Sequence, residues 1–242
     1  MLRNLLLILL IYPSLISGQT NNFERAQNLF NQGKINEALK QANVEIGKLK
    51  VSDTMFVAFV KLRVTCNMYL SQYNLALEDY RTILNLDSND IFSCVGISYA
   101  YWMLHEMELC FKYLDRAYII DPKNILTLNN LSYFHGQAGN YDTGLKYANE
   151  GLALDSLTND LKATLLNNRG YAYIGLKNYD KALEDINNSI LLFPENSFAF
   201  YNRALANIGL NKTDNVCSDL KKSKKLGGNF IPKELNEKYC KN

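Results

Sequence analysis

The reactive side chains of this sequence do not form a catalytic pattern. Its two histidines, His105 and His135, lie far apart, and there is no H-E-x-x-H pair, G-x-S-x-G elbow, Gly-rich phosphate loop or dinucleotide-binding fingerprint. The adjacent acids Glu184 and Asp185 would point apart on a helix, which suits a solvated face rather than a two-carboxylate site. We therefore expect no catalytic residues and no enzymatic activity.

The cysteines do not suggest a metal centre. None of the five belongs to a C-x-x-C pair, and the histidines cannot complete a ligand set with them. Cys66, Cys94 and Cys110 are interpreted as small apolar residues of a packed core. Neither a metal nor a cofactor is expected.

Composition and charge narrow the class of protein further. Hydrophobic residues make up 48% of the 242 residues, which is enough for a packed core, and 26 Lys and Arg balance 24 Asp and Glu. Nucleic-acid binding needs a concentrated basic surface. Nucleic acid is therefore not expected as a partner.

Residues 1–18 have the layout of a secretory signal peptide. Arg3 precedes an apolar run from Leu5 to Tyr12, and Pro13 and small residues up to Gly18 follow. The run is shorter than the roughly 20 apolar residues of a membrane-spanning helix. We expect cleavage after Gly18 and an exported protein, periplasmic or extracellular. The alternative is an uncleaved N-terminal anchor, and only then is a membrane expected as a partner.

A short pattern recurs along the rest of the chain. Segments such as NYDKALEDI, NYDTGLKYA and QYNLALEDY place a small residue three positions after a tyrosine. Related positions recur every 34 or 38 residues, at Ala38, Ala76, Cys110, Gly144, Ala182 and Val216. The four extra residues of the longer spacings are close to one helical turn, so they can lengthen a helix without disturbing a stack.

A second column of small residues lies twelve positions before the first. It comprises Ala26, Val64, Ser98, Ser132, Gly170 and Ala204. Antiparallel helices need small side chains where their axes approach most closely. The two columns therefore predict six helix–turn–helix units, near residues 19–56, 57–90, 91–124, 125–162, 163–196 and 197–230.

This pattern resembles the tetratricopeptide repeat family, whose 34-residue unit is a helix–turn–helix with small, aromatic and Pro positions in these places. The resemblance implies an all-α, right-handed solenoid of about six units over residues 19–230. It also implies that the first helix of each unit lines a concave surface. Residues 231–242 are expected to form a C-terminal capping helix, because Pro232 can occupy a first helical turn.

Cys217 and Cys240 differ from the other cysteines because the capping helix could bring them together. A cap that folds back on the last repeat helix would place them side by side, and an exported chain meets an oxidising compartment. A disulfide between them and two free thiols both remain open.

Two rows of side chains are expected on the inner surface. Positions one repeat apart place tyrosines in one row and asparagines in the next, with Trp102 and Tyr201 beside them. The rows comprise Tyr99, Tyr133 and Tyr171, and Asn130, Asn168 and Asn202. Tyrosine offers contact area with a polar handle, and asparagine can donate to and accept from a peptide backbone. The alternative is ordinary repeat usage on an unused inner face.

We therefore predict a non-enzymatic scaffold that binds a protein or peptide in a groove between the third and sixth units. Family members that clamp the C-terminal carboxylate of heat-shock chaperones use Lys and Arg on their first helices. The corresponding positions of the Asn-bearing units hold no cation, so that resemblance does not extend to this groove. The alternative function is a structural component of a membrane-associated assembly, held by an uncleaved N-terminal anchor.

Overall fold

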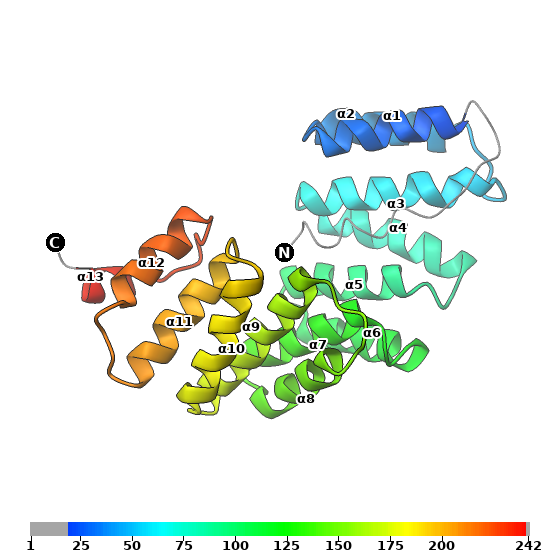
Figure 1. Ribbon diagram of the computed structural model, residues 1–242. Coiled ribbons are helices and arrows are strands. Elements are labelled where there is room, and N and C mark those ends of the chain that lie inside the picture. The colour runs from blue at the N-terminus through cyan, green and yellow to red at the C-terminus, as the bar shows by residue number, and fades with distance from the viewer. Residues whose placement is uncertain (1–18, 241–242) are drawn as a thin grey trace. The chain divides into compact units, whose positions relative to one another are not determined.

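The computed structural model describes residues 19–240 (Figure 1). The expected signal peptide, residues 1–18, and the last two residues lie outside the described part. Within residues 19–240 the chain forms thirteen helices and no strand, which confirms the all-α prediction. No helix of this part is long and apolar enough to cross a membrane.

The chain divides into two compact units after Ile120. The described part of the first contains α1 (Gln19–Asn31), α2 (Ile35–Ile46), α3 (Thr54–Tyr69), α4 (Tyr73–Leu86), α5 (Ile91–Met103) and α6 (Met107–Ile120). The second contains α7 (Ile125–Gln137), α8 (Tyr141–Leu152), α9 (Asn159–Gly175), α10 (Tyr179–Leu192), α11 (Ser197–Gly209), α12 (Val216–Lys225) and α13 (Lys233–Tyr239). The sequence predicted one uninterrupted array. Division into two units suits a repeat protein, because each repeat packs mainly against its sequence neighbours.

Two first helices are longer than the others. α3 and α9 contain 16 and 17 residues, whereas α5, α7 and α11 contain 13. They begin at Thr54 and Asn159, before the predicted unit starts near Val57 and Ala163. The extra residues of the 38-residue spacings therefore extend these helices at their N-termini, as the one-turn argument predicted.

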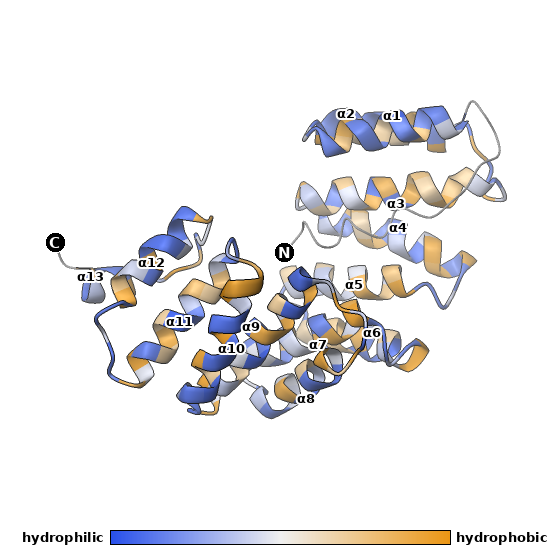
Figure 2. Cartoon of the chain, in the orientation of Figure 1, coloured by the Kyte–Doolittle hydropathy of each residue, from blue (hydrophilic) through white to orange (hydrophobic). Residues whose placement is uncertain are grey.

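The two columns of small residues are where paired helices meet, and every column residue is buried. In the second unit, a Cβ added to Gly144 would lie 3.0 Å from the carbonyl oxygen of Ser132. A Cβ added to Gly170 would lie 3.3 Å from the carbonyl oxygen of Ala182. Backbone approaches backbone at these points, which is why the columns hold small residues. Figure 2 shows that most helices carry both hydrophilic and hydrophobic residues, as expected when one side is buried.

The turn inside each helix pair contains one residue with a left-handed backbone. These residues stand at equivalent positions, and their φ values lie between 58° and 81°. They are Gly33, Ser71, His105, Gly139, Lys177 and Asn211. In each turn the next residue donates its backbone N–H to a carbonyl five positions back, for example from Glu106 to Tyr101 at 2.9 Å. His105 is therefore a turn residue.

Three of the helix pairs each contain an ion pair that was not predicted from the sequence. In each, an arginine directly precedes a residue of the second small-residue column and donates two N–H groups to an aspartate sixteen residues later. The pairs are Arg63–Asp79, Arg169–Asp185 and Arg203–Asp219, with N–O distances of 2.6 to 2.8 Å. We call them Arg–Asp clasps. Hydrogen bonding to the aspartate raises the pKa of the Arg169 and Arg203 guanidinium groups.

The expectation that Asp185 lies on a solvated face is wrong, since the residue is 5% exposed. Its carboxylate is buried because Arg169 supplies two charge-assisted hydrogen bonds. Arg169 also donates to the side-chain oxygen of Asn149 at 2.9 Å. The clasp therefore ties α8, α9 and α10 together. One repeat earlier, the equivalent positions hold the buried apolar pair Leu131 and Tyr147.

This exchange of an ion pair for an apolar pair can be tested in the second unit. Arg169→Leu is expected to lower the free energy of unfolding by about 1.5–3 kcal/mol, because Asp185 stays buried without its partner. Adding Asp185→Tyr, which copies the Leu131 and Tyr147 arrangement, is expected to recover at least half of that loss. Urea unfolding monitored by circular dichroism measures both. A double variant whose free energy of unfolding is no higher than that of Arg169→Leu would contradict the clasp.

Candidate functional site

The second unit contains a cleft of about 210 Å³. Its walls come from α7, α9 and α11, which are the first helices of three consecutive pairs, and from the connection between α12 and α13. The lining residues are Ser132, Tyr133, Gln137, Asn167, Asn168, Tyr171, Phe198, Tyr201, Asn202 and Phe230. The lining contains aromatic rings, amides and a hydroxyl, and no charged side chain.

The cleft includes most, but not all, of the groove residues expected from the sequence. Those that line it are Tyr133, Asn168, Tyr171, Tyr201 and Asn202. Asn130 is not a lining residue; it is 7% exposed, and its side-chain oxygen accepts from the amide of Asn129 at 3.5 Å. Tyr99 and Trp102 belong to the first compact unit and do not line the cleft. The cleft is formed by the fourth, fifth and sixth repeats, and a role for Tyr99 and Trp102 in a groove stays a prediction.

Asn168 and Asn202 of the cleft form side-chain hydrogen bonds to asparagines of the preceding repeat. Nδ2 of Asn168 donates to Oδ1 of Asn129 at 3.1 Å, and Nδ2 of Asn202 donates to Oδ1 of Asn167 at 3.0 Å. These amides hold α7 to α9 and α9 to α11. A primary amide can donate twice and accept twice, so the lining asparagines keep bonding capacity for a ligand.

An aromatic wall of the cleft was missed by the sequence analysis. The rings of Phe198 and Phe230 stack with centroids 4.2 Å apart and planes at 4°. Tyr201 meets Phe230 edge to face, with centroids 5.4 Å apart. Phe230 lies beyond the sixth helix pair, where repeat spacing makes no prediction. Its one signal was an isolated aromatic residue between a Gly pair and Pro232.

The electrostatics of the cleft favour a neutral ligand. Burial raises the pKa of Tyr171 and Tyr201, so both stay neutral and can donate hydrogen bonds. The hydroxyl of Ser132 is buried and has no hydrogen-bond partner within the described part of the chain. A charged ligand group would lose hydration here without meeting a counter-charge.

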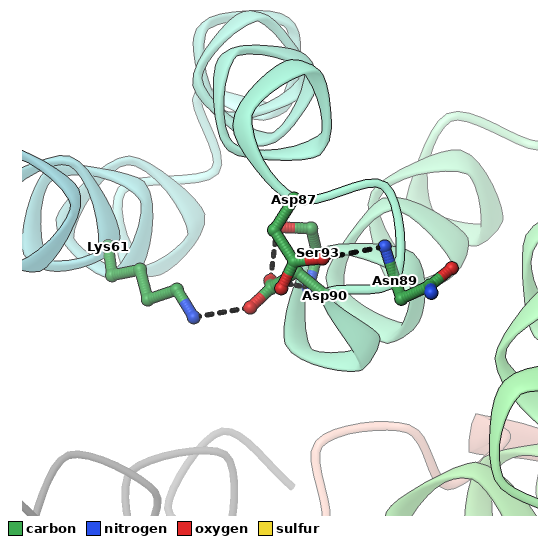
Figure 3. A network of polar contacts seen from close by, with 5 residues as sticks. All are labelled: Lys61, Asp87, Asn89, Asp90 and Ser93. Atoms are coloured by element: carbon green, nitrogen blue, oxygen red, sulfur yellow. Dashed lines mark hydrogen bonds and ion pairs between the residues drawn. The ribbon is translucent and has the colours of Figure 1, made fainter. Parts of the chain in front are cut away.

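In the second repeat, which belongs to the first compact unit, the position equivalent to Asn167 holds Lys61. Its ammonium lies 2.5 Å from Oδ1 of Asp90 (Figure 3) and also lies 5.0 Å from the centroid of the Phe92 ring. The same carboxylate caps α5 by accepting from the backbone N–H and the hydroxyl of Ser93. The charge of Lys61 is thus matched within the protein, which leaves little attraction for an acidic ligand.

The histidines and cysteines take structural positions. The ring of His135 stacks on Tyr147, with centroids 5.8 Å apart. Among residues 19–240, no three His, Cys, Asp or Glu side chains come together as a possible metal site. Cys217 of α12 and Cys240 after α13 are joined by a disulfide, one of the two states that the sequence left open.

Residues 163–196, the span of the fifth predicted repeat, match the family model described as tetratricopeptide repeat. This chain contains a tetratricopeptide repeat at these residues, and it shares the fold of tetratricopeptide repeat proteins of known structure. The tetratricopeptide repeat fold accounts for the helix pairs, the two small-residue columns and the cleft built from first helices. No curated protein matches the sequence as a relative.

Solved structures share the tetratricopeptide repeat fold of this chain. The structure of the APC/C hetero-tetramer Cut9–Hcn1 gives a TM-score of 0.77 at 19% identity, over 92% of this chain and 43% of that one. A tetratricopeptide repeat protein from Parabacteroides merdae gives 0.66 at 16% identity, over 86% and 79%. PilW, a type IV pilus biogenesis factor, gives 0.66 at 14% identity, over 76% and 86%. Identities this low show the fold alone.

The remaining thiols, Cys66, Cys94 and Cys110, are free and buried. Burial raises the pKa of Cys66 and Cys110 to about 12 and also raises that of Cys94. The thiolate is the reactive form, so these cysteines are expected to be inert in the folded protein at pH 8.

Thiol counting with a colorimetric disulfide reagent tests this assignment. We expect no rapid reaction in the folded protein, three thiols after denaturation without reductant, and five after reduction and denaturation. Released chromophore per chain is the readout. Five thiols in the unreduced, denatured protein would rule out the disulfide.

Proposed function

We propose that this protein is a non-enzymatic scaffold that binds a protein or peptide in the cleft of its second unit, in an exported compartment. The observation that carries the proposal is the cleft lining, which combines aromatic rings and amides on three consecutive first helices and contains no charge. Aromatic surface supplies contact area, and amides supply hydrogen bonds that suit a peptide backbone.

The size of the cleft favours a long ligand with one anchoring side chain. Its volume of about 210 Å³ lies below the roughly 300–1,000 Å³ of typical small-molecule sites. An extended peptide or a partner's surface segment could place one side chain in the cleft and lie along the first helices on either side. Peptide recognition commonly combines main-chain hydrogen bonds with a few such anchors.

The positions of the histidines and of Asp185 in the described residues are those of structural side chains. Repeat folds stack helices into extended surfaces, and proteins use these surfaces mainly for binding. In the described residues, His105 is in a turn, His135 packs on Tyr147, and Asp185 is held by Arg169. None of the three lines the cleft.

Export is supported by the sequence of residues 1–18, with its basic start, apolar run and small residues before Gln19. The same apolar run supports a second candidate, a structural component of a membrane-associated assembly that keeps its N-terminus as an anchor. PilW, which shares the fold, is described as a pilus biogenesis factor.

The binding proposal is tested by screening the purified protein against a displayed library of random dodecapeptides. We expect enriched peptides to bind the wild type, and Tyr133→Ala and Tyr201→Ala each to weaken binding about tenfold, because each removes an aromatic contact. Affinity is measured by calorimetry with one synthesised peptide.

Tyr69→Ala is the matched control, since Tyr69 is a half-exposed tyrosine of the first unit. It is expected to bind like the wild type, and circular dichroism should show native helicity in all three variants. Failure to enrich any peptide, or wild-type affinity in both cleft variants, would exclude the cleft as a peptide site.

Intact-mass analysis of the protein purified from its native source separates export from anchoring. Cleavage after Gly18 is expected to leave a chain that begins at Gln19. Retention of residues 1–18 together with recovery in the membrane fraction would instead support the anchored assembly component.

A further inference from the structure

One wall of the cleft does not belong to any helix pair. Phe230 lies in the connection between α12 and α13, yet it lines the cleft beside residues of α7, α9 and α11. One face of its ring is covered by Phe198, and Tyr201 meets it edge to face. The residue is still 39% exposed, which is high for a phenylalanine packed against two aromatic rings.

The chain before Phe230 is fixed by a tight turn at the end of α12. Gly227 has a φ of +90°, and the backbone N–H of Gly228 donates to the carbonyl of Ser223 at 2.9 Å. A Cβ on Gly228 would lie 2.8 Å from that same carbonyl oxygen, so glycine alone fits there. This helix-ending motif sets the direction in which the chain leaves α12.

The chain after Phe230 is fixed by a covalent bond. α13 has seven residues, none of them buried, and a helix this short is not stable by itself. Ile231, Leu235 and Tyr239 pack against a small core around Val216 and Leu220. The disulfide from Cys240 to Cys217 then closes a loop that starts on α12 and contains Phe230.

We propose that Phe230 is the specificity-determining residue of the cleft and that the Cys217–Cys240 disulfide is its positioning element. The inference rests on the proposed peptide-binding function and names the ligand class: an uncharged segment anchored by an aromatic side chain, which contacts the exposed part of the Phe230 ring.

Two properties of the cleft select this anchor. The stacked rings of Phe198 and Phe230 offer a flat apolar surface, and aromatic pairs gain stabilisation beyond the area that they bury. The rest of the lining is amide, hydroxyl and phenol, so an Asp, Glu, Lys or Arg side chain would enter without a counter-charge. An aliphatic anchor would fill the space but would lose the ring-to-ring contact.

The covalent tie makes this selectivity dependent on the redox state. A thiolate of an added dithiol attacks one sulfur and forms a mixed disulfide with that cysteine. The second thiol of the reagent then attacks the mixed disulfide and releases the cysteine as a thiol. Two electrons and two protons then reside on Cys217 and Cys240 as thiols, and the dithiol has become a disulfide. α13 keeps only its small apolar contact, so the end of the segment carrying Phe230 is no longer fixed.

The test uses five blocked heptapeptides that differ only at the centre, which is Phe, Tyr, Leu, Asp or Lys among Gly, Ser and Asn residues. Binding to the purified oxidised protein is followed by ligand-observed NMR titration. The wild type is expected to bind the Phe and Tyr peptides about tenfold more tightly than the Leu peptide, and the charged ones least. Cellohexaose serves as a neutral saccharide probe.

Phe230→Leu is expected to reduce the preference for Phe over Leu peptides to about twofold or less, while the Leu peptide binds as before. Phe230→Tyr should retain the preference. The Cys217→Ser/Cys240→Ser variant and the dithiothreitol-treated wild type should both lose most of it at native helicity. Tyr69→Leu, the same kind of change in the first unit, should alter nothing.

The outcomes separate this inference from the proposed function. Full aromatic preference in Phe230→Leu overturns the role of Phe230, and full preference without the disulfide overturns its positioning role; in both cases Tyr133→Ala still reports whether the cleft binds peptides. A wild type that binds none of the five peptides overturns this inference, and the dodecapeptide screen then decides on the proposed function. Tighter binding of cellohexaose than of every peptide assigns the cleft to saccharides and overturns the peptide class.

Discussion

The rest of the structure depends on the close approach of paired helices at the small-residue columns. At Gly144 the distance is set by backbone atoms of the facing helix, and at Gly170 by the side chain of Ile186 together with the backbone of Ala182. Such close contacts leave little freedom in how the two helices are rotated. This fixes what the neighbouring positions do. Ser132 is a column residue and the next residue, Tyr133, lines the cleft. Gly170 and Tyr171 show the same arrangement one repeat later. The packing contact and the inner surface are therefore parts of one helical register.

The features that follow from repetition could be predicted from the sequence. Helix pairs, buried columns and the alignment of Tyr133 with Tyr171 all follow from a spacing of 34 or 38 residues combined with helical geometry. Phe230 could not be predicted in this way, because it lies after the last helix pair and its neighbours in space are set by how the chain leaves α12. Whether the cleft binds a ligand also stays a prediction, since rows of tyrosine and asparagine arise in used and unused surfaces alike.

The Arg–Asp clasps show a different limit of sequence analysis. The environment of Asp185 is decided by Arg169, which lies sixteen positions away on the facing helix. The adjacent acid Glu184 had instead suggested that Asp185 is exposed to solvent. The signal was present, because the same arginine-to-aspartate spacing recurs at Arg63 and Arg203. The fourth repeat, which lacks it, places the buried apolar residues Leu131 and Tyr147 at the same two positions. The fold thus constrains the columns tightly and accepts more than one chemistry beside them.

The asparagine bonds between repeats have a consequence for how the cleft responds to occupancy. Asn168 and Asn202 line the cleft and also tie α9 to α7 and α11 to α9. A ligand that draws on these amides competes with, or reinforces, the bonds that set the spacing of three helices. Occupancy and helix spacing would then be coupled, so that a force that spreads the three helices would change the affinity for such a ligand. The stiffness of the second unit would therefore depend on whether the cleft is occupied.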